Sequence, residues 1–205
     1  MILPVAENRL HLMQLCAITD RKHTTEPLLN LVEGWSNGRV HFIQLREKDL
    51  DAPALQSLAQ EVSTRIDRRH SKLLLNVPAP EWAALARTAN ADGVHLAGPL
   101  QPDAAATVRQ SFPEAIISLP CHSLSDVAMA VVQRVDMILF SPIFEKLSHQ
   151  TQGIEGLRQA CAAAQGIPVF ALGGVTTANA AECIAAGATG VAAIRLFAGD
   201  DWRCL

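Results

Sequence analysis

Short apolar runs alternate with amphipathic stretches along the chain, and the apolar runs end in polar residues or glycine. The clearest unit lies near the C-terminus, where the apolar run 168–172 ends in Gly173 and Gly174. A helical pattern over about 176–185 then leads to a second apolar run that begins near Gly190. This order predicts a strand, a glycine turn, a helix and a further strand.

The same unit repeats along the whole sequence. Strands are predicted at residues 13–18, 40–45, 72–75, 93–96, 115–119, 135–140 and 168–172, and a last one begins near residue 190 and ends before Arg195. Helices are predicted at residues 26–35, 52–69, 80–89, from 102 onward, 124–133, 156–164 and 176–185. Strands joined by right-handed helical crossovers form a parallel sheet, and eight such units indicate a closed (β/α)8 TIM barrel. An open α/β sheet is the alternative.

We expect a single domain over residues 1–205, with residues 1–12 as an N-terminal extension. Only nine residues follow Leu196, which is too few for a full eighth outer helix. The last outer helix should therefore be shortened or missing. The N-terminal extension, or a partner subunit in a homodimer, could cover the outer faces of the first and last strands.

Composition narrows the class of protein. The chain is 49% hydrophobic and 18% charged, as expected for a globular protein. A net charge of −3 with scattered Lys and Arg gives no reason to expect nucleic-acid binding. No apolar run is long enough to cross a membrane, and Pro4 and Glu7 interrupt any signal-peptide core. Five cysteines without a C-x-x-C pair fit a reducing compartment, so we expect a cytoplasmic protein.

Unusual polar residues follow the predicted strands, where a barrel of this class carries its chemistry. Gln44, Arg46 and Lys48 alternate at the end of the second strand and point to one side if the strand continues that far, which predicts anion binding. Solvated charges beyond the strand are the alternative for Arg46 and Lys48. Asn76 ends the third strand and is either a ligand contact or a helix cap. His95 lies within the fourth strand, where a core histidine with a satisfied hydrogen bond is the favoured interpretation.

A second group of candidates lies after the later strands. His122 follows the fifth strand directly before the predicted helix cap Ser123, which suits a general acid–base. Glycine turns and helix starts leave backbone N–H groups free for phosphate. The candidate phosphate-binding residues of this group are Ser148, Thr151, Gly153, Gly173, Gly174 and Arg195.

Six segments together resemble the ThiE/TenI family of thiamine-phosphate synthases and thiazole tautomerases. They are AITD (17–20), IQLREK (43–48), ADGVHL (91–96), CHS (121–123), SPIFEK (141–146) and the stretch 171–192. The resemblance implies that Gln44, Arg46, Lys48 and Asn76 hold a pyrimidine diphosphate in a synthase. It also implies a phosphate cup at Gly173, Gly174 and the end of the last strand. There, synthases commonly have Ser in place of Arg195.

The resemblance implies one of two reactions. The synthase joins a pyrimidine diphosphate to a thiazole phosphate and uses two Asp residues as Mg²⁺ ligands. At these positions the chain has Val77 and Leu100, which supply no oxygen. The tautomerase isomerises a thiazole carboxylate phosphate without a metal, and His122 matches its proton-transferring histidine.

We therefore expect a TenI-like thiazole tautomerase with no cofactor and no metal ligands. The alternatives are a thiamine-phosphate synthase with altered Mg²⁺ ligation, and a non-catalytic protein that binds thiamine phosphate or thiazole phosphate. The expected partner is a small phosphorylated thiazole or thiamine phosphate, with neither nucleic acid nor membrane.

Overall fold

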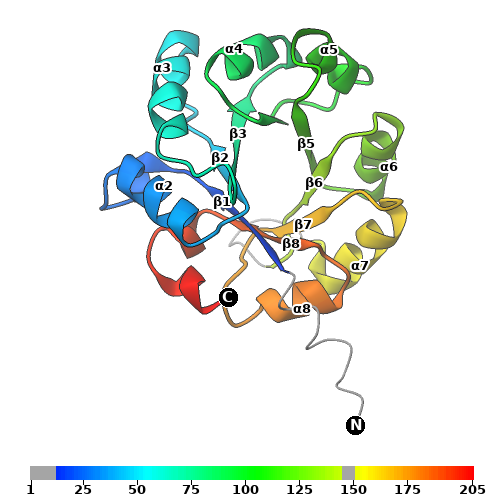
Figure 1. The fold of residues 1–205 in the computed structure, drawn as a ribbon. Helices are drawn as coiled ribbons and strands as arrows, with labels where there is room; N and C mark the ends of the chain where they lie inside the picture. Colours follow the sequence, from blue (N-terminus) through cyan, green and yellow to red (C-terminus); the bar gives the residue numbers. More distant parts are fainter. Residues whose placement is uncertain (1–12, 145–150) are drawn as a thin grey trace.

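The computed structural model describes residues 13–144 and 151–205. Eight parallel strands form a closed barrel in the order in which they occur along the chain, and helices surround it (Figure 1). An α-helix follows each of the first seven strands. The prediction of a (β/α)8 barrel is confirmed, and the open sheet is excluded. None of the helices in the described ranges is both long and apolar enough to span a membrane.

The elements follow the predicted order, with shifts of a few residues at their ends. The strands are β1 (Gln14–Ile18), β2 (Phe42–Leu45), β3 (Lys72–Val77), β4 (Gly93–Leu96), β5 (Ile116–Cys121), β6 (Met137–Phe140), β7 (Val169–Leu172) and β8 (Gly190–Ala193). The α-helices are α2 (Leu28–Asn37), α3 (Ala52–Ser63), α4 (Ala83–Thr88), α5 (Ala104–Ser111), α6 (Leu124–Val132), α7 (Gly153–Ala163) and α8 (Ala180–Ala185). Short 3-10 turns are η1 (Arg21–His23), η2 (Pro80–Trp82), η3 (Arg195–Phe197) and η4 (Asp201–Cys204).

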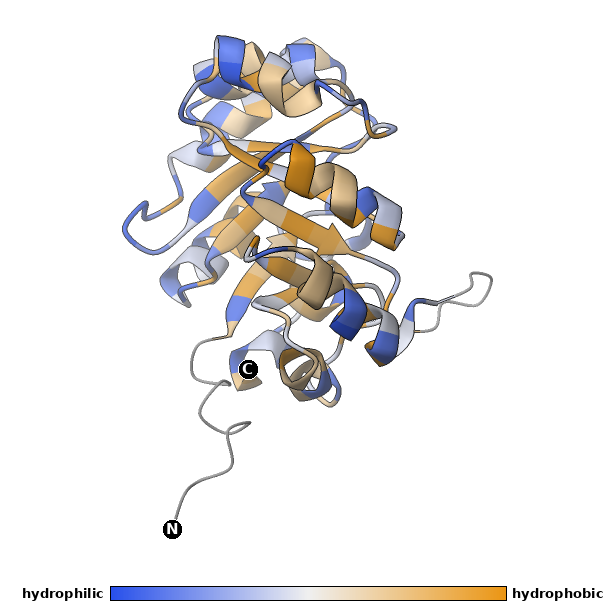
Figure 2. Ribbon diagram, turned by 90° about the vertical axis from the view of Figure 1, so that its right-hand side faces the viewer, coloured by the Kyte–Doolittle hydropathy of each residue, from blue (hydrophilic) through white to orange (hydrophobic). Residues whose placement is uncertain are grey.

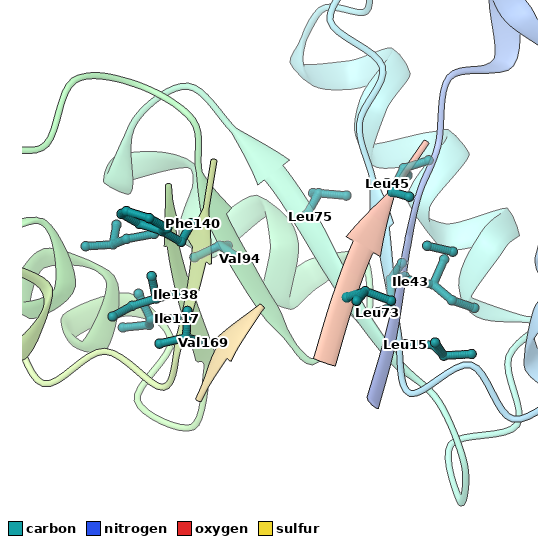
Figure 3. Packing of buried hydrophobic residues seen from close by; sticks show 14 of the residues in the cluster. Leu15, Ile43, Leu45, Leu73, Leu75, Val94, Ile117, Ile138, Phe140 and Val169 are labelled. Carbon is teal, nitrogen blue, oxygen red and sulfur yellow. The ribbon is translucent and has the colours of Figure 1, made fainter. Parts of the chain in front are cut away.

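The strands are apolar because both of their faces are buried. Alternate residues face the barrel interior, where a small cluster includes Leu74, Leu139 and Phe170. The intervening residues, such as Leu73 and Leu75, form a larger cluster beneath the helices (Figure 3). Figure 2 shows the strands as hydrophobic bands and the polar residues mostly on the outer helices and loops.

Local sequence sets the helix ends. The hydroxyl of Ser123 accepts a hydrogen bond from the Asp126 N–H at 3.1 Å, which confirms the predicted cap of α6. The predicted helix 52–69 is too long, since α3 ends at Ser63. Beyond it, the Ser36 hydroxyl accepts the Asp67 N–H at 2.8 Å and holds the chain in a turn before β3.

The C-terminal residues take the place of the last outer helix. The last strand, β8, ends at Ala193, and the 3-10 turns η3 and η4 follow it, so Arg195 lies after the strand as predicted. The Phe197 ring lies 5.9 Å from the Trp202 ring in a tilted arrangement and 6.1 Å from the Trp35 ring edge to face. The Trp35 indole N–H donates to the Phe197 carbonyl at 3.1 Å. Phe197 and Trp202 belong to the outer apolar cluster. The C-terminal tail therefore covers part of the barrel surface that we expected the N-terminal extension or a partner subunit to cover. The extension 1–12 lies outside the described residues.

Candidate active site

A cavity of about 740 Å³ opens at the carboxyl ends of the strands. Its walls come from every strand of the barrel or from the residue directly after it, as the class of fold predicts. Five of the predicted binding residues line it together with His122. These five are Gln44, Arg46, Lys48, Asn76 and Gly173.

The other predicted residues lie beside the cavity or beyond it. Gly174 and Arg195 begin the turns after β7 and β8, next to the lining residues Gly173 and Ile194. Gly153 opens α7, and its N–H donates to the Ile143 carbonyl at 3.1 Å. Neither Gly153 nor Thr151 is part of the cavity wall. Ser148 lies outside the described residues.

The loop after β2 is fixed by ion pairs that the sequence did not reveal. The Glu47 carboxylate accepts hydrogen bonds from the Thr19 hydroxyl at 2.6 Å and from the Arg21 guanidinium at 2.7 Å. Arg21 also pairs with Asp49 at 2.6 Å and holds the pKa of that carboxyl well below its usual range. Glu47 and Asp49 alternate with the cavity residues, so the same period of two predicts a second, outward-facing set.

The cations of this loop, Arg46 and Lys48, line the cavity. Within residues 13–144 and 151–205, no ion pair involves Arg46 or Lys48. The side-chain oxygen of Gln44 is fully buried and has no hydrogen-bond partner in that part of the chain. A buried polar atom without a partner destabilises a protein. This wall therefore fits a ligand whose anionic group binds the cations and whose hydrogen-bond donor binds the Gln44 oxygen.

His122 is held from three sides. Its Nδ1 lies 2.8 Å from the carbonyl oxygen of Ser141, and its backbone N–H donates to the Asp126 carboxylate at 2.7 Å. The amide of Gln152 donates to the His122 carbonyl at 2.7 Å. The bond to a carbonyl places a proton on Nδ1, which leaves Nε2 to exchange protons with a ligand. Gln152 was not predicted, and only its position at the start of α7 would have pointed to it.

His95 lies on the cavity floor and is uncharged. Its Nδ1 is 2.9 Å from the hydroxyl of Ser118, and the side chain is almost completely buried. Burial, followed by the charges of Arg46 and His122, lowers the pKa of His95 to about 3. The expected satisfied hydrogen bond is present, but this histidine also borders the cavity.

The glycine turn after β7 packs directly against the loop after β6. Gly173 and Gly174 have φ angles of +99° and +70°, which other residues adopt only with strain. A Cβ on Gly173 would lie 2.9 Å from Pro142 Cα, and one on Gly174 would lie 2.8 Å from Phe144 Cβ. In the described part of the chain, the backbone N–H groups of Gly174 and Arg195 make no backbone hydrogen bond. Two free donors on neighbouring strand ends fit the predicted phosphate cup.

The residues present do not fit the magnesium site that the resemblance implies. Val77 is fully buried in the outer apolar cluster, and Leu100 packs against that cluster while it lines the cavity. Among the described residues that line the cavity, Asp126 is the one carboxylate, and its oxygen already accepts the His122 N–H. No group of three or more His, Cys, Asp or Glu side chains able to hold a metal occurs among the described residues.

A depression of about 830 Å³ lies at the opposite end of the barrel, and the charged side chains among its described lining residues form ion pairs with one another. It surrounds the starts of β3, β4 and β5, where Arg68 contacts Asp92 and Arg87 lies 3.7 Å from Glu114. This end of a (β/α)8 barrel contributes to stability rather than to chemistry. The cavity at the carboxyl ends is therefore the candidate active site.

Fold and cavity define a (β/α)8-barrel protein whose mouth combines cations, free backbone donors and an oriented histidine. A family model described as thiamine monophosphate synthase matches residues 15–197. The chain belongs to this family, and its relatives place it in thiamine biosynthesis.

Individual relatives cover almost the whole chain. A Geobacter sulfurreducens protein provisionally named a thiamine-phosphate synthase is 40% identical over 91% of this chain and 87% of its own. A Moorella thermoacetica protein named thiamine-phosphate synthase is 32% identical over 89% of this chain and 86% of its own. The solved structure of a Pyrococcus furiosus thiamine phosphate pyrophosphorylase covers 96% of this chain and 92% of its own. It superposes with a TM-score of 0.79 at 24% identity, which supports the fold.

Proposed function

We propose that the chain is a thiazole tautomerase, which moves a proton on a phosphorylated thiazole carboxylate without a metal. The observation that carries the proposal is the orientation of His122. Its Nδ1–H is bound to the Ser141 carbonyl at 2.8 Å, so Nε2 is the basic nitrogen. The family membership supports a phosphorylated thiazole as substrate, and the residues at positions 77 and 100 argue against metal-assisted chemistry.

The reaction needs only one acid–base group. Nε2 of His122 takes a proton from one position of the heterocycle and returns a proton at another, so the isomerisation conserves atoms and charge. The Ser141 carbonyl stabilises the imidazolium that forms between the two transfers. The N–H groups of the turn at Gly173 and Gly174 would hold the phosphate, and Arg46 and Lys48 would attract the carboxylate.

The second candidate function is thiamine-phosphate synthesis. The names of the relatives favour it over the tautomerase. Gln44, Arg46, Lys48 and Asn76 could hold a pyrimidine diphosphate, and all four border the same cavity. The charge on a leaving diphosphate would then rest on Arg46 and Lys48.

One experiment separates these functions. Purified protein is incubated either with the unaromatised thiazole carboxylate phosphate or with the two synthase substrates, each with and without Mg²⁺. We expect accelerated tautomer formation that is independent of Mg²⁺ and that His122→Ala lowers by about 10²–10⁴-fold. His70→Ala is the matched control, because His70 is exposed and lies just before β3, at the other end of the barrel.

The other outcomes are equally clear. Thiamine phosphate formed only with Mg²⁺, without tautomerisation, would establish the synthase and overturn our proposal. Calorimetric binding of thiamine phosphate without turnover of either substrate set would instead establish a non-catalytic binding protein.

A further inference from the structure

The cavity floor is polar on one side and apolar on the other. Side chains that face the interior at the carboxyl ends of β2, β3 and β4 are Gln44, Asn76 and His95. On the opposite side the corresponding residues are Ile18, Leu139, Leu172 and Ile194. A bound heterocycle can therefore rest on the apolar side, next to the turn that follows Leu172, and direct a polar substituent toward the other side.

His95 holds a central place on the polar side. It is in register with Asn76 of β3 on one flank and with Ser118 of β5 on the other. The Ser118 hydroxyl is completely buried, and its one hydrogen-bond partner in the described part of the chain is Nδ1 of His95 at 2.9 Å. A buried hydroxyl proton needs an acceptor, so Ser118 donates to Nδ1. The neutral ring then carries its proton on Nε2.

The Nε2–H group has no recorded acceptor among the described residues, although His95 is 5% exposed and borders the cavity. The buried Gln44 oxygen on β2 also lacks a partner there. A buried oxygen and a ring N–H that faces the cavity, both without a partner in the described residues and on the same side of the floor, point to a ligand that completes both. Arg46 and Lys48 attract an anion over a long range, and the uncharged Nε2–H of His95 adds a directional hydrogen bond to it.

We propose that His95 is a specificity-determining residue that donates a hydrogen bond from Nε2 to the ring carboxylate of the phosphorylated thiazole. Ser118 fixes the tautomer that makes this donation possible. The inference rests on the proposed function for the identity of the ligand, and it adds a contact that selects the carboxylate-bearing form. A ligand without the carboxylate would leave the buried donor unpaired, which costs binding energy.

The test measures dissociation constants by calorimetry for thiazole phosphate with and without the ring carboxylate. His95→Leu should weaken binding of the carboxylate form by about tenfold and change binding of the other form by less than about twofold. His95→Gln keeps an amide donor and should retain most of the affinity. Ser118→Ala should weaken only the carboxylate form, by less than His95→Leu does. Circular dichroism confirms that each variant is folded.

Each further outcome is decisive. Equal weakening of both ligands by His95→Leu, or no weakening of either, would overturn the role of His95. Wild-type protein that binds both ligands without converting the carboxylate form would refute the tautomerase, while the binding comparison still decides the role of His95. Wild-type protein that binds neither ligand would overturn both.

Discussion

Nδ1 of His122, at the end of β5, lies 2.8 Å from the backbone oxygen of Ser141, at the end of β6. The acid–base candidate is thus oriented by the backbone of the neighbouring strand, and substitution of a side chain cannot remove this contact. The same strand end continues into the loop that packs on the glycine turn after β7. The acid–base candidate and the predicted phosphate cup therefore both contact the segment that follows β6.

Acid should destabilise the protein through His95. Its pKa is lowered from 6.5 to about 3, so the unfolded chain binds a proton that the native state excludes. The contribution of His95 to the free energy of unfolding is therefore fully present above pH 6.5 and is lost as the pH falls toward 3. The loss amounts to about 1.4 kcal/mol per pH unit. Urea unfolding at pH 7 and pH 5 should show that His95→Gln loses about 2 kcal/mol less than wild type.

The control for this measurement is His70→Gln, since His70 is exposed. It should follow the wild-type pH dependence. Identical pH dependence in His95→Gln and wild type would show that His95 is not kept neutral by the fold.

Gly174 should tolerate no side chain. Alanine there must adopt a φ of +70° and also places a methyl group 2.8 Å from Phe144 Cβ. Gly166→Ala is the matched control, because it has a φ of +92° but open space around its Cβ. We expect a loss of about 1–2 kcal/mol at Gly166 and a larger loss at Gly174 in thermal unfolding. Only Gly174→Ala should weaken binding of thiazole phosphate, and equal affinity losses in both variants would refute the phosphate cup.

The Glu47 carboxylate should contribute more to the free energy of unfolding than the exposed ion pairs do. Its side chain is only 2% exposed and accepts hydrogen bonds from Thr19 and Arg21. Glu47→Gln should lower the free energy of unfolding by about 1–3 kcal/mol, because it removes the buried carboxylate charge that pairs with Arg21. Arg69→Gln breaks a pair whose guanidinium is 82% exposed and should cost less than about 1 kcal/mol. Equal unfolding midpoints in urea for the two variants would contradict this difference.

Gly38 and Trp202 should be energetically coupled. A Cβ at Gly38 would lie 2.2 Å from the Trp202 ring, so Gly38→Ala should destabilise wild-type protein by more than about 1 kcal/mol. Trp202→Ala should cost about 3–5 kcal/mol, because the indole is buried. In the Trp202→Ala background, Gly38→Ala should cost only a few tenths of a kcal/mol, about the size of a surface substitution. A double-mutant cycle measures the coupling, and strictly additive costs would show that the tail does not pack on α2.

The barrel was predictable because strand burial on both faces leaves a strong apolar signal at regular intervals. β4 was predicted to the residue, and the Ser123 cap marked the start of α6. The end of α3 and the packing of the tail after β8 were not predictable from periodicity. Both are set by distant contacts, namely the Ser36 hydroxyl and the aromatic packing around Phe197.

Some residues of the candidate site were predictable from the sequence and others were not. Residues that follow strands, such as Arg46 and His122, were found because topology alone brings them to one end of the barrel. Glu47, Gln152 and Ser118 were missed because each acts through a partner that is 23 to 30 residues away in sequence. His95 was assigned to the core because burial and cavity contact cannot be separated in a strand that is covered on both faces.

The pairing of β1 with β8, which joins Gln14 to Gly190, closes the sheet through residues at opposite ends of the sequence. During synthesis, β1 cannot find its second neighbour until the chain has been extended past residue 190. Until then it is an open sheet edge, free to pair with another nascent chain. This contact therefore makes barrel closure a late step, and β8, which is the last strand to be synthesised, protects the N-terminal strand from aggregation.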